Sequence, residues 1–565
     1  MMKKNIRQCL FLIAGIALLA LFSHKYSFRI DLTAEKRYTL SPETRQILRQ
    51  LDAPLHLNVY LEGDMPAGFR KLRNGIREIL DDFKRYAGSR LSCDFIDPSE
   101  AVEMKEREQF YAELEETGVR KITVSETNRD GSLSQQTLFP GAVASCGNRM
   151  SAINFLNNNG TLSPDRALNA SLEGIEYELI KTIRTLSADS IEKIAFITGH
   201  GELGRAETYD LGLEYANYYD VDRKTINGKP DALDHYKAVI VAKPKEAFDE
   251  RDKFVIDRYI MRGGKVIWLI DAVEVNTDSL FSSGLTFALA SSLNLEDQLF
   301  TYGVRINPHL VQDMANHPIV VTLADGSSNP VPVPWLYHPL VNASPAHVVT
   351  RYLNPVWLRY AGDIDTVGTD SGIRKTVLLR TSQHSRTKAA PFMIYLNERI
   401  PEQEQFNRPH RITAVLLEGK FPSVFRSRSV KNMFPDLNEP QATVSVDTKM
   451  AVVSDGDIAR NDVRNTLQGA VPAQPLGYDR YSRRTFANKD FLVNVLNYLT
   501  DDAGVMKLRN REFQLRLLDR QKVNRELLKW QIINVLLPVL IWICGGIACG
   551  IWRRRKYGRP ATPIP

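Results

Sequence analysis

The longest apolar run in the sequence lies near its C-terminal end, where residues 532–552 read IINVLLPVLIWICGGIACGIW. About 20 consecutive apolar residues are enough for a helix to cross the hydrocarbon core of a bilayer. Only Asn534 and Pro538 interrupt the run, and a membrane-spanning helix tolerates a proline. We therefore expect a transmembrane helix over 531–552, which requires the rest of the chain to fold beside a lipid bilayer.

A shorter apolar run, CLFLIAGIALLALF at Cys9–Phe22, follows the basic residues Lys3, Lys4 and Arg7. A positive start and an apolar middle fit both an uncleaved anchor and a cleavable signal peptide. The bulky stretch LFSHKYSF offers no small-x-small cleavage site, which favours an N-terminal transmembrane anchor over 1–25. Under either interpretation the residues between the two runs lie outside the cytoplasm.

The net charge of +7 is concentrated in the two tails of the chain. Eight basic residues flank the apolar runs on their outer sides, and without them 65 basic residues face 66 acidic ones. Lys and Arg beside membrane spans mark the cytoplasmic side. We expect an inner-membrane protein with both termini cytoplasmic, including a basic tail at 553–565, and with a periplasmic body. The nearly neutral body argues against nucleic-acid binding, which needs a basic surface.

The body between the apolar runs begins with the mixed pattern of a small α/β domain. Apolar residues recur at helical spacing in GFRKLRNGIREILDDFKRYAG, and LHLNVYLE alternates like a strand. These patterns predict a first α/β domain over 26–165, followed by a connecting helix over 166–190. Closer to the C-terminal run, KLRNREFQLRLLD alternates and RQKVNRELLKWQ has helical spacing, so a membrane-proximal strand and helix are expected over 503–530.

A second α/β domain is expected over 191–502. The buried-strand patterns EKIAFITGH, YKAVIVAKP and KVIWLIDAVEV alternate with amphipathic helical segments, which predicts a parallel sheet. Residues 280–441 are irregular and rich in Pro and Asn, and we interpret them as a large insertion. KMAVVSDGDIARND then resumes the strand pattern, and NKDFLVNVLNYLTDD is a helix that would close the domain.

Two cysteines, Cys93 and Cys146, lie in the predicted soluble body. An exported domain can join two such residues in a disulfide, and two buried free thiols fit the sequence equally well.

The stretch FITGHGELG places Gly199, His200, Gly201 and Glu202 where a predicted strand ends. The glycines fit a tight turn. Backbone N–H groups at such a position also suit contact with a ligand or partner, and His200 oriented by Glu202 is a conceivable general base. A lone His-x-Glu is too few ligands for a metal. We expect a structural turn that offers ligand or partner contact.

A similar loop follows a later strand in VVSDGDIARN, which contains Asp455 and Asp457. Paired acids at a strand end polarise a ligand or hold a cation, and they also favour turns and helix caps. If the sheet is parallel, both loops lie at its carboxyl edge, where ligands of α/β proteins usually bind.

The signatures of several enzyme classes are missing from the sequence. There is no GxSxG elbow and no HExxH motif, and no Cys follows the strands of the second domain. GTDSGIRKT lacks the spacing of a P-loop, so the chain should not hydrolyse ATP by itself. We expect no catalytic residues, no metal and no cofactor.

Long stretches carry a family resemblance, among them DLTAEKRYTLSPETRQILRQLDAPLHLNVYLEGDMPAGFRKL, IAFITGHGE, YGVRINPHLVQD, LEGKFPSVF and NKDFLVNVLNYLTDD. The sequence resembles GldG-type proteins, the gliding-motility-associated substrate-binding or auxiliary components of ABC transporters in Bacteroidota. The resemblance implies a membrane-anchored subunit that works with a separate multispanning permease and a separate ATPase. It also implies a second domain similar to the glutamine-amidotransferase-like domain of intraflagellar-transport proteins, which is a binding module.

Three functions are consistent with these observations. The first is a non-catalytic extracytoplasmic subunit of an ABC transporter complex that binds an unknown substrate or envelope protein. The second is a structural scaffold of envelope machinery. The third is an envelope hydrolase, which would need a working His200, Glu202 or Asp455.

Overall fold

The computed structural model describes residues 39–100, 103–127, 133–156, 164–188, 190–322, 330–368, 372–428, 430, 434–435, 441–466, 469–472, 474–510 and 520–557. The chain divides into two compact units, residues 1–511 and 512–565. The predicted N-terminal anchor over 1–25 lies outside the described residues, as do the last eight residues of the basic tail.

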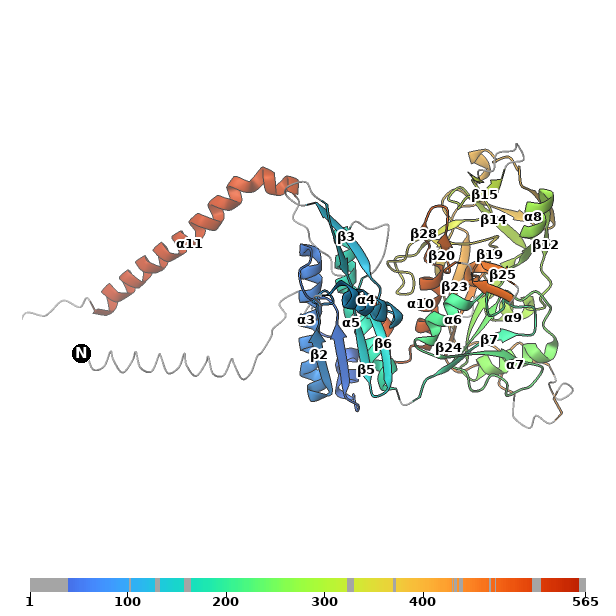
Figure 1. Ribbon diagram of the computed structural model, residues 1–565, viewed down its shortest axis with the longest axis horizontal. Helices are drawn as coiled ribbons and strands as arrows, with labels where there is room; N and C mark the ends of the chain where they lie inside the picture. Colours follow the sequence, from blue (N-terminus) through green and yellow to red (C-terminus); the bar gives the residue numbers. More distant parts are fainter. Residues whose placement is uncertain are drawn as a thin grey trace, which may run out of the picture. The chain divides into compact units, whose positions relative to one another are not determined.

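A four-stranded sheet forms the first part of the larger unit (Figure 1). Its strands are, in spatial order, β2 (Leu91–Phe95), β1 (Leu55–Val59), β5 (Gly141–Cys146) and β6 (Arg149–Asn154). Strands β1 and β2 are parallel because a long helix connects them, and the other neighbours are antiparallel. The helices and the separate hairpin here are α2 (Pro42–Arg49), α3 (Ala67–Ala87), η1 (Gly88–Arg90), α4 (Met104–Glu116), α5 (Pro164–Ser187), β3 (Ile122–Thr127) and β4 (Leu133–Leu138).

Helices cover both faces of this sheet. The apolar residues of α3 recur every three or four positions and are buried, and they share one hydrophobic core with α5 and with Leu57 and Val59 of β1. Helix α4 packs on the opposite face, where Leu114 lies against Val143 of β5. Helices α3 and α5 lie in the segments with predicted helices over 68–88 and 166–190.

Cys93 and Cys146 are free thiols. Cys93 lies on β2 and Cys146 on β5, and β1 runs between these two strands. Two strand spacings amount to about 10 Å, more than the roughly 7 Å that a disulfide can bridge between Cα atoms. Burial raises the pKa of the Cys93 thiol to about 11, which keeps it protonated at neutral pH.

A nine-stranded sheet forms the second part of the larger unit. Five neighbouring strands are parallel: β24 (Thr448–Val453), β10 (Lys265–Leu269), β9 (Ala238–Ala242), β7 (Lys193–Thr198) and β8 (Asp220–Thr225). The sheet continues beyond β24 with β23 (Ile412–Gly419), β20 (Ile373–Arg380), β17 (Leu340–Ala343) and β18 (Val356–Trp357), which pair antiparallel.

The expectation of a parallel sheet is therefore correct for five strands and wrong for the sheet as a whole. Strands β17, β18, β20 and β23 come from the segment interpreted as an insertion, and they extend the central sheet. Antiparallel neighbours need only short connections, whereas each parallel pair needs a crossover, which explains why this segment contains few helices.

The remaining elements form small sheets and short helices around the main sheet. They are α8 (Thr277–Ser283), α9 (Glu296–Thr301), η2 (Gln403–Gln405), η3 (Asp457–Ala459), β11 (Val273–Val275), β12 (Leu285–Ala290), β13 (Val304–Asn307), β14 (His309–Asp313), β15 (Ile319–Thr322), β16 (Pro330–Val333), β19 (Asp363–Thr366), β21 (Ser385–Ala389), β22 (Phe392–Tyr395), β25 (Val463–Thr466), β26 (Gly469–Pro472), β27 (Tyr478–Asp479) and β28 (Arg484–Thr485).

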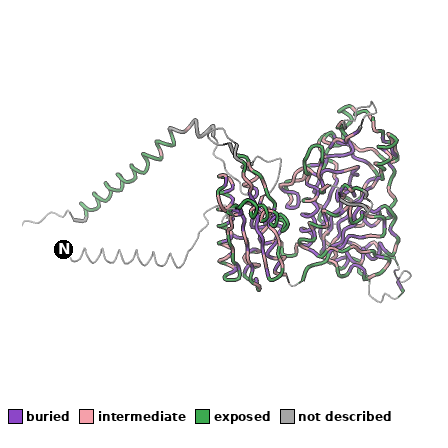
Figure 2. Tube along the Cα trace, in the orientation of Figure 1, coloured by how far each residue is buried: buried purple, intermediate pink, exposed green. Residues whose placement is uncertain are grey.

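The inner strands of the nine-stranded sheet bury alternate residues on its two faces. Ile194 and Phe196 of β7 share a core with α6 (Tyr209–Ala216) and α10 (Asn488–Thr500). Ala195 and Ile197 face the opposite core with α7 (Glu250–Met261). Burial on both faces accounts for the continuous apolar runs in the sequence of these strands. Figure 2 shows the buried residues concentrated in the sheet interiors.

A glycine at the end of β23 is required by close backbone approach. Gly419 has a φ of +132°, and a Cβ atom there would collide with the carbonyl oxygen of Gly372. We expect Gly419→Ala to lower the free energy of unfolding by about 1–3 kcal/mol from backbone strain alone. Gly174→Ala is the control, because a Cβ at Gly174 in α5 meets open space and alanine favours helix. Urea unfolding of the full chain in mild detergent measures both, and equal stability of the two variants would contradict the assignment.

The C-terminal unit contains one long helix, α11 (Arg520–Tyr557). Residues Lys529–Arg555 are long and apolar enough to cross a membrane, and none of this segment is buried. The expected membrane-proximal helix runs without interruption into this segment. Figure 2 shows the apolar part of α11 as exposed.

The predicted membrane-proximal strand is wrong where the structure describes it. Val505–Asn510 form the 3-10 helix η4, whose Val505, Met506 and Leu508 are buried in the core that contains α5. The backbone N–H of Met506 donates to Asp501, so the segment has local partners instead of a strand neighbour. The rest of the predicted strand, 511–519, lies outside the described residues.

Candidate functional site

The loops that carry the predicted contact residues lie at the same edge of the main sheet. Strands β7, β9, β10 and β24 are mutually parallel, so the loops after them all emerge at the carboxyl edge. Gly199–Glu202 follow β7, and Asp455 and Asp457 follow β24. Two strands separate β7 from β24, so the two loops occupy different positions along this edge.

The Gly199–Glu202 loop is a compact turn. Gly199 and Gly201 have φ values of +119° and +74°, a region that L residues rarely adopt. The backbone N–H of His200 donates to the Glu202 carboxylate, and that of Leu203 donates to the Ala242 carbonyl. These amides are therefore already used within the protein.

The His200 ring is enclosed by three partners. Its Nδ1 lies 3.2 Å from Glu202 Oε1, and its Nε2 lies 3.1 Å from Asp252 Oδ2. The ring stacks on Phe248 with a centroid separation of 3.7 Å. His200 thereby joins the turn after β7 to the first turn of α7.

The electrostatics of His200 follow from this enclosure. Burial alone would lower the pKa of His200, but the hydrogen bonds and charges of Asp252 and Glu202 outweigh burial and raise the pKa to about 9. The imidazole is therefore positively charged at neutral pH. A charged ring with both nitrogens engaged has no lone pair with which to accept a proton from a substrate.

Asp455 and Asp457 belong to a second, separate cluster of buried polar groups. The ammonium of Lys243, which follows β9, lies 3.0 Å from Asp271 Oδ2 and 2.5 Å from Asp457 Oδ2. Asp455 accepts hydrogen bonds from the backbone N–H groups of Arg359 and Asp457. Sequence reasoning found two members of this cluster and missed Lys243 and Asp271.

Each carboxylate of the cluster responds differently to its surroundings. Burial raises the pKa of Asp455 well above its ordinary value, and the neighbouring Asp271 and Asp457 raise it further. Burial would also raise the pKa of Asp457, but the Lys243 charge outweighs it and lowers the pKa. Lys243 lies between two carboxylates of the cluster, and Arg460 adds a second cation 3.4 Å from Asp457.

A cleft of about 1410 Å³ opens above the Asp457 cluster at the carboxyl edge. Its lining includes Lys243, Asp271 and Asp457 together with His338 and Trp357. The cleft combines charged and aromatic side chains in a concave space large enough for a small molecule or a peptide segment. His200 and Glu202 do not line it, so the structure brings only one of the two predicted loops to this cleft.

Most charged groups of the cleft already have partners within the protein. Arg359 pairs with Asp462 at 3.1 Å, Arg460 pairs with Glu207 at 3.3 Å, and His317 lies 3.2 Å from Asp479. A charged ligand would have to compete with these pairs.

Several buried polar side chains of the cleft, among them His338 and Trp357, have atoms without a hydrogen-bond partner among the described residues. His338 is 6% exposed and neither ring nitrogen has a hydrogen-bond partner, and Trp357 Nε1 also has none. The two rings lie 5.9 Å apart. Burial holds the pKa of His338 well below its ordinary value, so the ring is neutral, with one donor and one acceptor. These groups can hydrogen-bond an uncharged part of a ligand.

The fold is that of an α/β protein with a polar cleft at the carboxyl edge of the parallel part of a mixed sheet. A sequence profile of the family described as "ABC-type uncharacterized transport system", the auxiliary components of ABC transporters, matches residues 192–495, more than half of the chain. The chain belongs to this family of ABC transport-system auxiliary proteins. A second profile, "Domain of unknown function (DUF7088)", matches residues 34–145.

Other comparisons add little to the family assignment. No curated protein matches the sequence. The chain is similar to a solved structure described as "mmIFT52 N-terminal domain", with 13% identity and a TM-score of 0.32, over 55% of this chain and 97% of that chain.

The unpartnered His338 leads to a test of the cleft. Because His338 makes no hydrogen bond in the described structure, we expect His338→Phe to change the free energy of unfolding by less than about 1 kcal/mol. If the cleft binds ligands through this ring, the same variant loses any ligand-dependent rise in thermal unfolding midpoint. The exposed His384→Phe serves as control. Thermal unfolding of the full chain against a metabolite panel measures both effects, and a large stability loss in His338→Phe would contradict the assignment.

Proposed function

We propose that this chain is a non-catalytic, extracytoplasmic auxiliary subunit of an ABC transporter complex that binds a substrate or an envelope partner. Its partners would be a separate multispanning permease and a separate ATPase. The match of the transport-system family over 192–495 supports the transporter association, and the apolar α11 supports attachment to the membrane.

The observation that carries the binding role is the chemistry of the carboxyl-edge cleft. Its carboxylates and cations are mostly engaged with each other, and the buried groups without a hydrogen-bond partner among the described residues include the neutral His338 and Trp357. Because burial holds the pKa of His338 well below its ordinary value, its neutral imidazole is a weak base. These groups therefore suit hydrogen-bonded recognition of a ligand more than proton transfer or nucleophilic attack. Of the predicted contact residues, Asp457 lines this cleft and is the best placed for contact.

The finer parts of the proposal rest on the sequence. The GldG-type resemblance supports a role in gliding motility or in cell-envelope transport in a bacterium of the Bacteroidota. The apolar runs and the basic tails support two transmembrane helices in the inner membrane, cytoplasmic termini and a periplasmic body.

A truncation separates the membrane role of α11 from the folding of the body. A chain that ends at residue 519 lacks α11. We expect the full chain, purified from membranes, to retain the permease and the ATPase, and the shortened chain to lose both while its body still unfolds cooperatively. Retention of both partners by the shortened chain would show that α11 is not the attachment site, and purification of both chains without partners would overturn the subunit proposal.

A further inference from the structure

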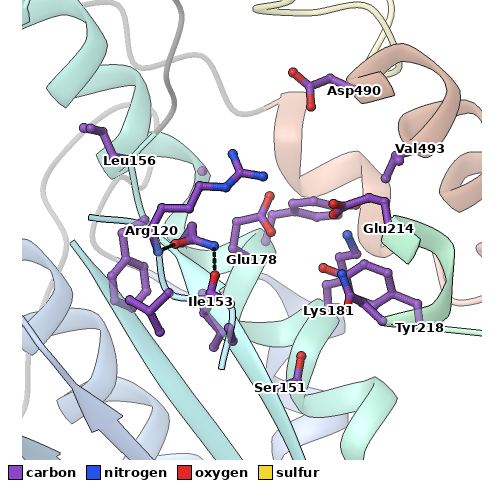
Figure 3. A pocket seen from close by; sticks show the side chains of 18 of the residues that line it. Arg120, Ser151, Ile153, Leu156, Glu178, Lys181, Glu214, Tyr218, Asp490 and Val493 are labelled. Atoms are coloured by element: carbon purple, nitrogen blue, oxygen red, sulfur yellow. Dashed lines mark hydrogen bonds between the residues drawn. The ribbon is translucent and has the colours of Figure 1, made fainter. Parts of the chain in front are cut away.

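A second cavity, of about 990 Å³, lies elsewhere in the larger unit, where α5, β6, α6 and α10 meet (Figure 3). It shares no lining residue with the carboxyl-edge cleft. Charged side chains of both signs line it. Six of these charged side chains, three cations and three carboxylates, form no ion pair with another described residue. They are Arg120, Lys181, Arg509, Glu178, Glu214 and Asp490.

The other charged groups of this cavity are already engaged. Lys121 pairs with Glu115 at 2.9 Å, and Glu173 accepts a hydrogen bond from the Tyr352 hydroxyl at 2.9 Å. Arg149 donates to the carbonyl of Ala188. The six unpaired groups are therefore a distinct subset within the cavity lining.

Aromatic rings position two of the unpaired cations. The Lys181 ammonium lies 3.7 Å from the centroid of the Tyr218 ring, and the Arg509 guanidinium lies 5.5 Å from that of Tyr177. An aromatic face attracts a cation without using its N–H donors. Arg509 Nη1 is buried and has no hydrogen-bond partner among the described residues.

The unpaired carboxylates come from three different helices. Glu178 lies on α5, three residues before Lys181, Glu214 lies on α6, and Asp490 lies in the first turn of α10. Figure 3 shows Arg120 and Glu178 extending into the same space, with Asp490 on the α10 side of it. Positive and negative groups thus face the cavity together without neutralising each other directly.

We propose that this cavity binds a small dipolar ligand that carries both an ammonium and a carboxylate group, as a free amino acid or a short peptide does. A ligand of one charge sign would meet like charges on part of the lining. A dipolar ligand offers a carboxylate to Lys181, Arg120 or Arg509 and an ammonium to the acids. Charge-assisted hydrogen bonds of this kind are stronger than neutral ones.

Calorimetric titration of the full chain in mild detergent tests this assignment. The probes are the twenty common amino acids, dialanine, N-acetyl-dialanine and dialanine amide. We expect one-to-one binding of an uncapped probe and a loss of at least about tenfold in affinity when either end of dialanine is capped, equivalent to about 1.4 kcal/mol. Stronger binding of a single amino acid than of dialanine identifies free amino acids as the source, and the reverse identifies peptides. The absence of binding by every uncapped probe, or equal binding of capped and uncapped dialanine, would overturn the proposal.

Two variants connect the binding to this cavity. Lys181→Met and Glu178→Gln should each weaken binding of the probe by at least about tenfold, with the unfolding midpoint retained. Lys121→Met, which removes a paired lysine of the same lining, should leave affinity nearly unchanged. Unchanged affinity in both test variants would contradict the assignment. Co-purification of the permease and the ATPase does not depend on these side chains, so a failure here is distinguishable from a failure of the transporter role.

Discussion

Replacing His200 by alanine should destabilise the protein by about 3–5 kcal/mol, because two buried carboxylates lose their shared cation. The side chains of Glu202 and Asp252 are 1% and 10% exposed, so water cannot replace the imidazolium without opening the turn. The variant also loses the stacking contact with Phe248. Urea unfolding of the full chain in mild detergent, followed by tryptophan fluorescence, measures the loss.

Protonation of His200 predicts that the stability of the protein falls as the pH rises. The folded pKa of about 9 is above the ordinary value of 6.5, so the folded protein binds the proton more tightly. The contribution of protonated His200 to the free energy of unfolding is therefore fully present below about pH 6.5 and is lost as the pH rises to 9. A shift of this size corresponds to about 3 kcal/mol. The wild-type protein should lose stability over this interval, and His200→Ala should not.

A matched control distinguishes the ion pairs from histidine titration in general. His235 lies in the same domain and is exposed, so His235→Ala should leave both the stability and its pH dependence unchanged. Similar stability of His200→Ala and His235→Ala would contradict the structural role assigned to His200.

Replacing Lys243 by methionine should have an effect of similar size, about 3–5 kcal/mol, for the same physical reason. Its ammonium neutralises Asp271 and Asp457 within a cluster that also contains Asp455, which is fully buried. Removal of this ammonium leaves three adjacent buried carboxyl groups, and the remaining cation, Arg460, is shared between Asp457 and Glu207. Urea unfolding at neutral pH measures the loss, and Lys245→Met is the control because Lys245 is exposed two residues along the same loop.

Acid should affect the wild-type protein and Lys243→Met in opposite directions. In the wild type, Lys243 lowers the pKa of Asp457, so the contribution of this carboxylate is present above about pH 4 and is lost as the pH falls through the lowered folded pKa. Without the lysine, burial raises the pKa of Asp457. Protonation of a carboxylate then relieves the repulsion between the neighbouring carboxylates of the cluster. The variant should therefore gain stability between about pH 7 and pH 5. The same pH slope in both proteins would contradict the ion-pair assignment.

The sequence predicts those parts of the fold that have strong periodicity. Strands β7, β9, β10 and β24 are buried on both faces, so each appears as an apolar run, and the helical spacing of α3 is equally clear. Strand β8 is different. Its sequence DVDRKT is polar and has no buried residue because it forms the edge of the sheet, so no hydrophobic pattern indicates it.

The sequence predicted which loops carry candidate site residues, but it did not predict which of these loops share a cleft. Glycines and acids after buried strands indicate the carboxyl edge, and the order of the strands decides which loops share a cleft. That order places β10 and β9 between β24 and β7, which separates Asp457 from His200. His338 and Trp357 reach the cleft from segments without a recognisable motif, and their importance comes from burial without partners, which no sequence pattern reports.

Purification of the tagged native protein in mild detergent, with quantitative mass spectrometry of the proteins that accompany it, tests the transporter role most directly. The account predicts a multispanning permease and a P-loop ATPase in fixed, near-stoichiometric amounts. Recovery of the chain alone, or with envelope proteins that include no ATPase, would contradict it.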